Sequence, residues 1–267
     1  MNTREFAGRT VLITGGGGGI GYATAELLAE RGAAVVALGP DDPGLDKVAQ
    51  LPRSAAVPGD AADENDVHRA VGVALGNGGR LDAVVCCAGI GTFGTVLDPE
   101  PVWRDTLRAN LDTAYVTTRR ALPALIDTGG AIVLVSSLAG TLAVPGSAAY
   151  TTSKHALIGL TRSLAADFGP LGVRANVVCP GAVRTAMLDR VMDEAGSRSG
   201  LDRDAAYRHA GSLVPLRRAA EPSEIAEVIA FLAGPRSAVV TGAVLMADCG
   251  VSAVDLSLSA LDQNMTH

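Results

Sequence analysis

The sequence has no block of basic residues. Its 22 Lys and Arg residues are outnumbered by 28 Asp and Glu residues, so the formal net charge is -6 at pH 7. This balance gives no long-range attraction to the phosphates of nucleic acid or of anionic lipid. We therefore expect no nucleic-acid partner, no membrane partner and a small ligand.

Long apolar runs are also missing. No unbroken apolar stretch reaches the ~18 residues that a membrane-spanning helix needs. The first ten residues, MNTREFAGRT, lack the apolar centre of a secretory signal peptide. The sequence therefore predicts a soluble protein of the cytoplasm.

The four cysteines lack the spacing of metal ligands. Cys86, Cys87, Cys179 and Cys249 all lie in apolar segments, and a bridge between the adjacent Cys86 and Cys87 would be strained. We predict free, buried thiols and no bound metal.

What the sequence does contain is an alternation of short apolar runs with segments of helical period. The runs are continuously apolar, which is typical of strands buried on both faces. The predicted strands are residues 10–14, 34–38, 83–87, 131–136, 173–178 and 243–246, and the predicted helices are residues 24–31, 63–75, 102–126, 150–168 and 225–232. This order predicts an α/β fold with a doubly wound, Rossmann-type parallel sheet and helices on both faces.

No linker or internal repeat divides the chain, so we predict one domain over residues 1–267. Residues 184–218 form the least regular segment. Ligands of open α/β sheets bind beyond the carboxyl ends of the strands, so we expect this segment to be a substrate lid. The alternative is a surface insertion without a role. A C-terminal tail is expected from about residue 251.

Five consecutive glycines connect the first predicted strand to a helix, within VLITGGGGGIG at residues 11–21. Such a turn offers backbone N–H groups and the positive end of a helix dipole to a pyrophosphate. The spacing of Gly15, Gly19 and Gly21 differs from G-x-G-x-x-G, and Tyr22 stands where an ATPase loop needs Lys. We predict a phosphate-binding turn rather than an ATPase loop or a flexible linker.

Tyr150 and Lys154 are four residues apart in a predicted helix and therefore share one face. A phenol has a pKa near ~10, and a nearby ammonium lowers that pKa by stabilising the phenolate. Tyr150 could then exchange a proton with an alcohol or ketone oxygen, and Ser137 could donate to the same oxygen. The pair alone leaves open a surface contact without a role. Asn110 lies inside a predicted helix, where Asn is unfavourable, so we expect it to have a functional role. The alternative is a solvent-exposed helix position without a role.

Together these motifs resemble those of the short-chain dehydrogenase/reductases. The match runs from about residue 8 to residue 250 and includes TGxxxGIG at residues 14–21 and PGAVRT at residues 180–185. The resemblance implies that Tyr150 is the general acid/base and that Ser137 orients the substrate oxygen. It also implies that Lys154 binds the nicotinamide ribose and lowers the pKa of Tyr150. Asn110 would hold a water in a proton relay.

The sequence and the resemblance together predict a set of dinucleotide contacts. Asp60 matches the adenine-contacting aspartate of the family, and the segment after residue 180 would cover the nicotinamide. The full set is Gly15, Gly19, Ile20, Gly21, Asp41, Asp60, Ala61, Ala88, Gly89, Tyr150, Lys154, Pro180, Gly181, Val183 and Thr185.

Two departures from the family pattern bear on this set. Cys86 and Cys87 stand where Asn-Asn usually precedes Ala-Gly, which removes polar side chains that brace the sheet. Gly39 stands at the position of the NAD-selecting Asp, and Pro40 follows where NADP enzymes often have Arg. Asp41 and Asp42 come next, and a carboxylate of either near the ribose repels a 2′-phosphate and accepts from a 2′-hydroxyl. We favour NAD(H), with NADP(H) as the alternative.

The sequence thus predicts an NAD(P)-dependent oxidoreductase that interconverts a secondary alcohol and a ketone. One alternative is a catalytically silent dinucleotide-binding protein of the same fold. A sugar-nucleotide epimerase is not favoured because few residues follow the last predicted strand, and a hydrolase is not favoured because G-x-S-x-G is missing. Mostly apolar residues near the predicted site favour a neutral carbonyl or alcohol substrate. The resemblance also implies a homotetramer.

Overall fold

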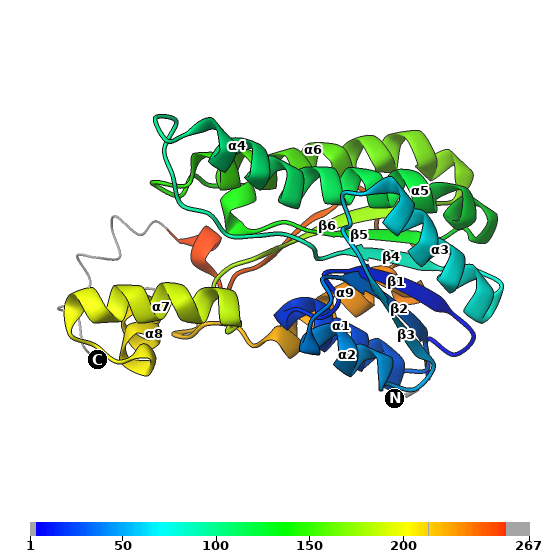
Figure 1. Ribbon diagram of the computed structural model, residues 1–267, viewed down its shortest axis with the longest axis horizontal. Coiled ribbons are helices and arrows are strands. Elements are labelled where there is room, and N and C mark those ends of the chain that lie inside the picture. The colour runs from blue at the N-terminus through cyan, green and yellow to red at the C-terminus, as the bar shows by residue number, and fades with distance from the viewer. Residues whose placement is uncertain (1–3, 213, 255–267) are drawn as a thin grey trace.

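The computed structural model describes residues 4–212 and 214–254, and its centre is a seven-stranded parallel sheet (Figure 1). The strand order is β3-β2-β1-β4-β5-β6-β7. The strands are β1 Thr10–Thr14, β2 Ala34–Gly39, β3 Ser54–Pro58, β4 Ala83–Cys86, β5 Ala131–Val135, β6 Arg174–Pro180 and β7 Val244–Ala247. The strand order reverses between β1 and β4, and such a switch point is where doubly wound sheets bind ligands. The predicted α/β fold is confirmed.

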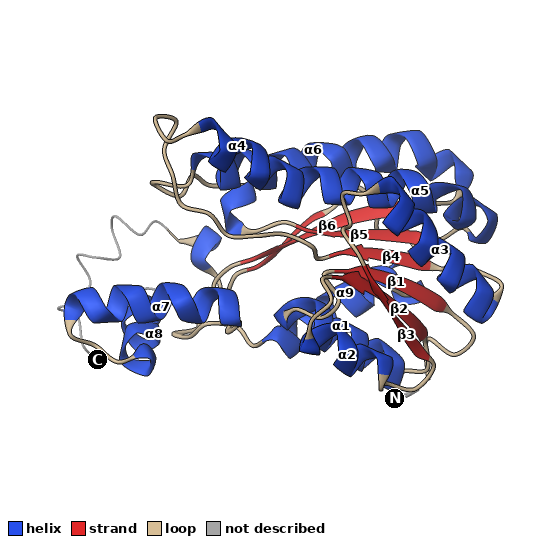
Figure 2. Ribbon diagram, in the orientation of Figure 1, coloured by secondary structure: helices blue, strands red, loops and turns tan. Residues whose placement is uncertain are grey.

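Helices cover both faces of the sheet (Figure 2). Helices α3, α5 and α6 lie on one face, and α1, α2 and α9 lie on the other. The helices are α1 Gly19–Glu30, α2 Pro43–Ala49, α3 Glu64–Gly78, α4 Glu100–Leu107, α5 Thr113–Thr128, α6 Ala148–Phe168, α7 Ala186–Ser199, α8 Arg203–Gly211 and α9 Pro222–Ala233.

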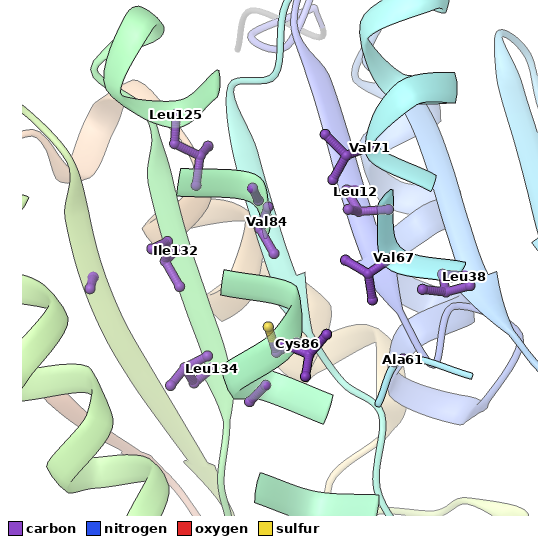
Figure 3. Close-up of a cluster of buried hydrophobic side chains, with 14 of the residues drawn as sticks. Leu12, Leu38, Ala61, Val67, Val71, Val84, Cys86, Leu125, Ile132 and Leu134 are labelled. Atoms are coloured by element: carbon purple, nitrogen blue, oxygen red, sulfur yellow. The ribbon is translucent and has the colours of Figure 1, made fainter. Parts of the chain in front are cut away.

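Each face of the sheet carries its own apolar core. Leu12, Val84 and Ile132 point toward α3 and α5, where they pack with Val67 and Leu125 (Figure 3). The neighbouring residues of the same strands point to the other face, because successive side chains of a strand alternate. They pack there against α1 and α9. Strands β1, β4 and β5 are therefore buried along their whole length, which explains their continuous apolar runs.

Two elements near the second strand were not predicted. Strand β3 lies at the edge of the sheet and has the sequence SAAVP, which offers little apolar signal. Helix α2 has seven residues and begins with Pro-Gly. The Asp42 side chain caps it by accepting from the Leu45 N–H at 2.9 Å. A short helix of this kind depends on its cap and on packing rather than on an extended helical period.

The segment expected to be least regular is helical instead. Helices α7 and α8 occupy most of residues 184–218 and project from the sheet (Figure 1, yellow). Arg203 pairs with Asp193 through two contacts of 2.7 and 2.6 Å, and the Tyr207 hydroxyl donates to Asp189 at 2.9 Å. These polar contacts join α7 to α8. The sequence alone could not predict them, because they link residues of different helices.

The tail predicted from about residue 251 lies largely outside the described residues. Among the described residues, this tail contributes a short 3-10 turn, Val251–Ala253. Within residues 4–212 and 214–254, no helix combines the length and the apolar character needed to cross a bilayer.

All four cysteines are free thiols. Cys86 and Cys179 are buried, as predicted, but Cys87 and Cys249 are only partly buried, so the prediction of buried thiols is wrong for these two. In the part of the chain that the structure describes, no group of three His, Cys, Asp or Glu side chains is placed to hold a metal ion.

Candidate active site

The glycine run forms a tight turn between β1 and α1. Gly15 has a φ of +66°, a conformation that favours glycine, and its N–H donates to the Leu38 carbonyl at 2.8 Å. A Cβ atom on Gly21 would lie 2.1 Å from the Gly15 carbonyl oxygen. The turn therefore has no room for a side chain at Gly21, and it forms a cradle of backbone at the start of α1. Such a cradle suits a pyrophosphate.

The same turn touches the segments that follow three other strands. A Cβ atom on Gly15 would lie 2.8 Å from the backbone nitrogen of Ala88, which follows β4. A Cβ atom on Gly19 would lie 2.6 Å from the side chain of Thr185, which follows β6. One on Gly17 would lie 2.6 Å from the backbone nitrogen of Leu45 in α2. The carboxyl ends of β1, β2, β4 and β6 thus meet at one edge of the sheet.

At the β3 end of this edge, Asp60 forms an ion pair that the sequence did not reveal. Its carboxylate lies 2.6 Å from the Arg108 guanidinium and accepts from the Ala62 N–H at 2.8 Å. Asp41 is exposed in the connection between β2 and α2. Ala61 is buried in the core on the α3 side.

The segment after β6 supplies the last group of predicted contacts. Pro180 ends the strand, and a Cβ atom on Gly181 would lie 2.9 Å from the Cα atom of Asp248. Val183 is buried and forms an isolated bridge with residue 220. Ile20 packs against the core on the α1 side. The side chains of Val183 and Ile20 therefore serve packing.

Lys154 is buried beneath the same edge. Its ammonium donates to the Val135 carbonyl at 3.1 Å and lies 5.6 Å from the centre of the Tyr150 ring. A Cβ atom on Gly89 would lie 3.5 Å from the ammonium nitrogen. Burial lowers the pKa of Lys154 to about 8, while the neighbouring Cys87 has a small opposite effect.

Ser137 follows β5 and adjoins the Tyr150 phenol. Its Oγ accepts from the Ala139 N–H at 3.2 Å. Burial raises the pKa of Tyr150, and the neighbouring Ser137 hydroxyl lowers it by less. The structure therefore differs from the expectation that Lys154 lowers the pKa of Tyr150. The physical reason is that the buried phenolate loses more solvation than Ser137 restores.

Asn110 lies in a π-helical turn, Arg108–Asp112, between α4 and α5. It is 1% exposed, which excludes a solvated helix position. Its Oδ1 accepts from the Ile90 N–H at 2.7 Å, and its Nδ2 donates to the Ile90 carbonyl and to Ser153 Oγ, each at 3.1 Å. Ser153 in turn donates to the Tyr150 carbonyl at 2.7 Å. Asn110 therefore ties the segment after β4 to the helix that carries Tyr150.

Sequence reasoning missed Arg108, Ile90 and Ser153 at this site. The π-helical turn rotates the chain differently from a regular α-helix, so a period of 3.6 residues does not show which side chains face the site. Ser153 could have been found, because it lies three residues after Tyr150 on the predicted helix.

Exposed apolar side chains occur on the segments that flank this edge. They are Phe93, Leu142, Val144 and Met187, with exposures between 38% and 64%. The Met187 sulfur lies 3.1 Å from where a Cβ atom on Gly91 would stand, so α7 reaches the segment after β4. A separate cavity of about 370 Å³ lies between residues 92–103 and Ala149, and neither Ser137 nor Tyr150 lines it.

Comparisons with known proteins agree with this geometry. Residues 16–252 match the family described as Enoyl-(Acyl carrier protein) reductase. Protein MoaE of Klebsiella aerogenes is 38% identical, over 93% of this chain and 97% of that protein. The 2,5-dichloro-2,5-cyclohexadiene-1,4-diol dehydrogenase of Sphingobium indicum is 36% identical, over 94% of this chain and 99% of the relative.

Two solved structures share the fold. Ligand-free aldohexose dehydrogenase from Thermoplasma acidophilum has a TM-score of 0.86 and 29% identity, covering 95% of this chain and 97% of that one. Levodione reductase has a TM-score of 0.87 and 29% identity, covering 94% and 100% of the two chains.

Proposed function

Because the chain belongs to the short-chain dehydrogenase/reductase family and is an NAD(P)-dependent oxidoreductase, we propose that it interconverts a secondary alcohol and a ketone with Tyr150 as the general acid/base. The observation that supports this most is the arrangement of the Tyr150 phenol beside Ser137 and above the buried Lys154 ammonium. A site with these three groups can move a proton to or from one oxygen atom.

The glycine turn fits the pyrophosphate of a dinucleotide, because its backbone cradle excludes side chains at Gly15 and Gly21. When bound, the dinucleotide supplies or accepts the hydride of the reaction. The chain's own residues handle the proton. In the direction of reduction, the Tyr150 hydroxyl gives its proton to the substrate oxygen while the Ser137 hydroxyl donates a hydrogen bond to that oxygen. In the direction of oxidation the proton returns to Tyr150.

Lys154 and Asn110 support this transfer in different ways. The Lys154 ammonium is held by the Val135 carbonyl at 3.1 Å and lies 5.6 Å from the centre of the Tyr150 ring, and we keep the proposal that it binds the nicotinamide ribose. Asn110 fixes the segment after β4 through its two hydrogen bonds to Ile90. We keep the proposal that Asn110 also takes part in a proton relay through water.

A panel of ketones and secondary alcohols tests this function directly. Each compound is incubated with the enzyme and with NADH, NADPH, NAD or NADP, and the nicotinamide absorbance is followed. We expect turnover of at least one neutral substrate. Measured dinucleotide binding without turnover across the panel would favour the silent binding protein.

The substrate proposed here is a neutral aliphatic or cyclic carbonyl compound or its alcohol. Exposed Phe93, Leu142, Val144 and Met187 supply apolar surface beside the site. The Sphingobium relative is named for a neutral cyclic diol. We also propose a cytoplasmic homotetramer on the family resemblance, and light scattering would measure its mass.

We propose NAD(H) as the preferred cofactor, with Asp41 as the discriminating residue. Asp42 is engaged in capping α2, whereas Asp41 is exposed where β2 leads into α2. We expect kcat/KM to favour NAD over NADP and Asp41→Asn to narrow the preference by about twofold to fivefold, the range of an exposed charge interaction. Asp46→Asn removes an equal exposed charge within α2 and should leave the ratio unchanged. Both cofactors are compared at one ionic strength, and a wild-type preference for NADP would refute the assignment.

The helices α7 and α8 are proposed as the substrate lid. Among the described elements they pack mainly on each other, and Met187 reaches the segment after β4. Trypsin can cleave α7 after Arg190 and Arg198. With NAD(H) at ten times its Kd, we expect cleavage there to slow by about tenfold, because a ligand that binds only the closed state opposes opening. Cleavage after Arg104 on α4 serves as the control, and equal rates at α7 with and without cofactor would indicate a surface insertion.

A further inference from the structure

A second cavity lies at the opposite edge of the sheet, where the strands begin. Its volume is about 460 Å³. Its walls include the segments just before β1 and β4 and the first residues of β5 and β6. The glycine turn follows the carboxyl end of β1, so the length of the sheet separates this cavity from the candidate active site. Five glycines are among the lining residues, namely Gly129, Gly130, Gly169, Gly172 and Gly234.

The charged side chains that line this cavity are three arginines and one aspartate. Asp82 is 2% exposed and accepts from the Thr10 N–H at 2.9 Å. Arg80 binds the same carboxylate through Nε and Nη2, with contacts from 2.5 to 3.0 Å. Arg9 reaches it only at 3.5 Å. Arg80 neutralises the Asp82 carboxylate, which the Thr10 N–H also binds, so Arg9, Arg80 and Asp82 together keep one net positive charge.

Arg174 adds a third positive charge without adding a carboxylate. Its guanidinium donates to the carbonyls of Leu232, Gly234 and Val240 and to the Ser237 hydroxyl. Burial lowers the pKa of Arg174, and the positive charge of Arg9 lowers it further. Arg9 and Arg174 therefore both add positive charge to the lining of this cavity.

This local charge is opposite in sign to that of the whole chain. The cavity lining carries three positive side chains and one negative one, whereas the chain has a formal net charge of -6. An anion bound in this cavity would balance the positive charge of its lining. Guanidinium groups bind phosphate and carboxylate oxygens through two parallel hydrogen bonds, and the volume is sufficient for either ion.

We propose that this cavity is a binding site for a small, multiply charged oxyanion, a phosphate or a dicarboxylate, held by Arg9 at its rim. The bound anion joins residues before β1 to those at the start of β6. It stabilises the native state, because only the folded chain brings these arginines together. The site is separate from the reaction proposed above and does not depend on it.

The test is a titration of the enzyme with sodium phosphate and, separately, with sodium malonate. Thermal unfolding and calorimetric binding are measured at constant ionic strength, with saturating dinucleotide present so that phosphate does not occupy the glycine turn. We expect a saturable rise in Tm for at least one ion, and the ion that binds more tightly identifies the preferred group. Arg9→Gln should raise the apparent Kd of the anion by about tenfold or more, since the substitution removes charge-assisted hydrogen bonds.

Two further variants separate this site from general salt effects, because phosphate also stabilises proteins without binding them. Arg198→Gln removes an equal charge from α7, where the side chain is 80% exposed, and should leave the titration unchanged. Arg9→Lys keeps the charge and should retain part of the binding. The proposal is wrong if neither ion gives a saturable effect, or if Arg9→Gln titrates like the wild type.

Discussion

We expect Tyr150→Phe to lower kcat by at least about 10²-fold, the effect of losing a general acid/base group. The substitution removes one oxygen atom and keeps the ring, so the cation–ring contact with Lys154 is preserved. The hydrogen bonds of Asn110 to Ile90 and Ser153 do not involve the phenol, so the architecture around the site remains. Dinucleotide affinity should therefore change little. Steady-state kinetics and fluorescence titration with the dinucleotide measure the two quantities.

Tyr115→Phe is the matched control for this substitution. Tyr115 lies on α5 and is 50% exposed, so the same oxygen is removed away from the candidate site. Its kcat should equal that of the wild type. If folded Tyr150→Phe keeps full activity, another group transfers the proton and the assignment of Tyr150 is refuted.

Most of the sheet could be predicted because its strands are buried on both faces. Strand β1, Thr10–Thr14, was predicted with its observed limits, and β4 differs from the prediction by one residue. Strand β3 is at the edge and mixes small residues with Pro58, so local sequence gives little evidence for it. Its place follows from pairing with β2, which is a property of the folded chain.

Helices α7 and α8 were missed for a related reason. Their outer faces are polar, and few of their residues are buried, so hydrophobic periodicity hardly marks them. Capping does mark them: the side chains of Thr185 and Asp202 accept from backbone N–H groups at the starts of α7 and α8. Reading these two caps together would have predicted both helices.

At the candidate site, the sequence could supply residues that are close in the chain but not their tertiary partners. The spacing of Tyr150 and Lys154 predicted a shared helix face, and the structure places the ammonium near the ring. The pKa of Tyr150 could not be predicted, because it depends on how deeply the phenol is buried. The contact between Asp60 and Arg108 joins residues that are distant in the chain, so the local sequence around either residue does not predict it.

We expect Gly21→Ala to weaken dinucleotide binding by about 10²-fold, because it forces the start of α1 away from β1. The new Cβ atom would stand 2.1 Å from the Gly15 carbonyl oxygen and 3.1 Å from the Gly16 Cα atom. Both obstacles are backbone, so the turn itself must move, and a displacement of about 1 Å in a positioned site can cost 10²-fold. The free energy of unfolding should also fall by about 1–3 kcal/mol, as in other overpacked sites.

Gly18→Ala is the control within the same turn. A Cβ atom there meets only the Gly15 carbonyl oxygen at 3.5 Å, an ordinary contact, and the backbone φ of Gly18 is -88°. Its free energy of unfolding should match the wild type. If Gly18→Ala still binds the dinucleotide less tightly, the ligand itself approaches the turn at that residue. Unchanged stability and unchanged affinity in Gly21→Ala would show that the turn adapts without cost, and the glycine cradle would then have no part in holding the pyrophosphate.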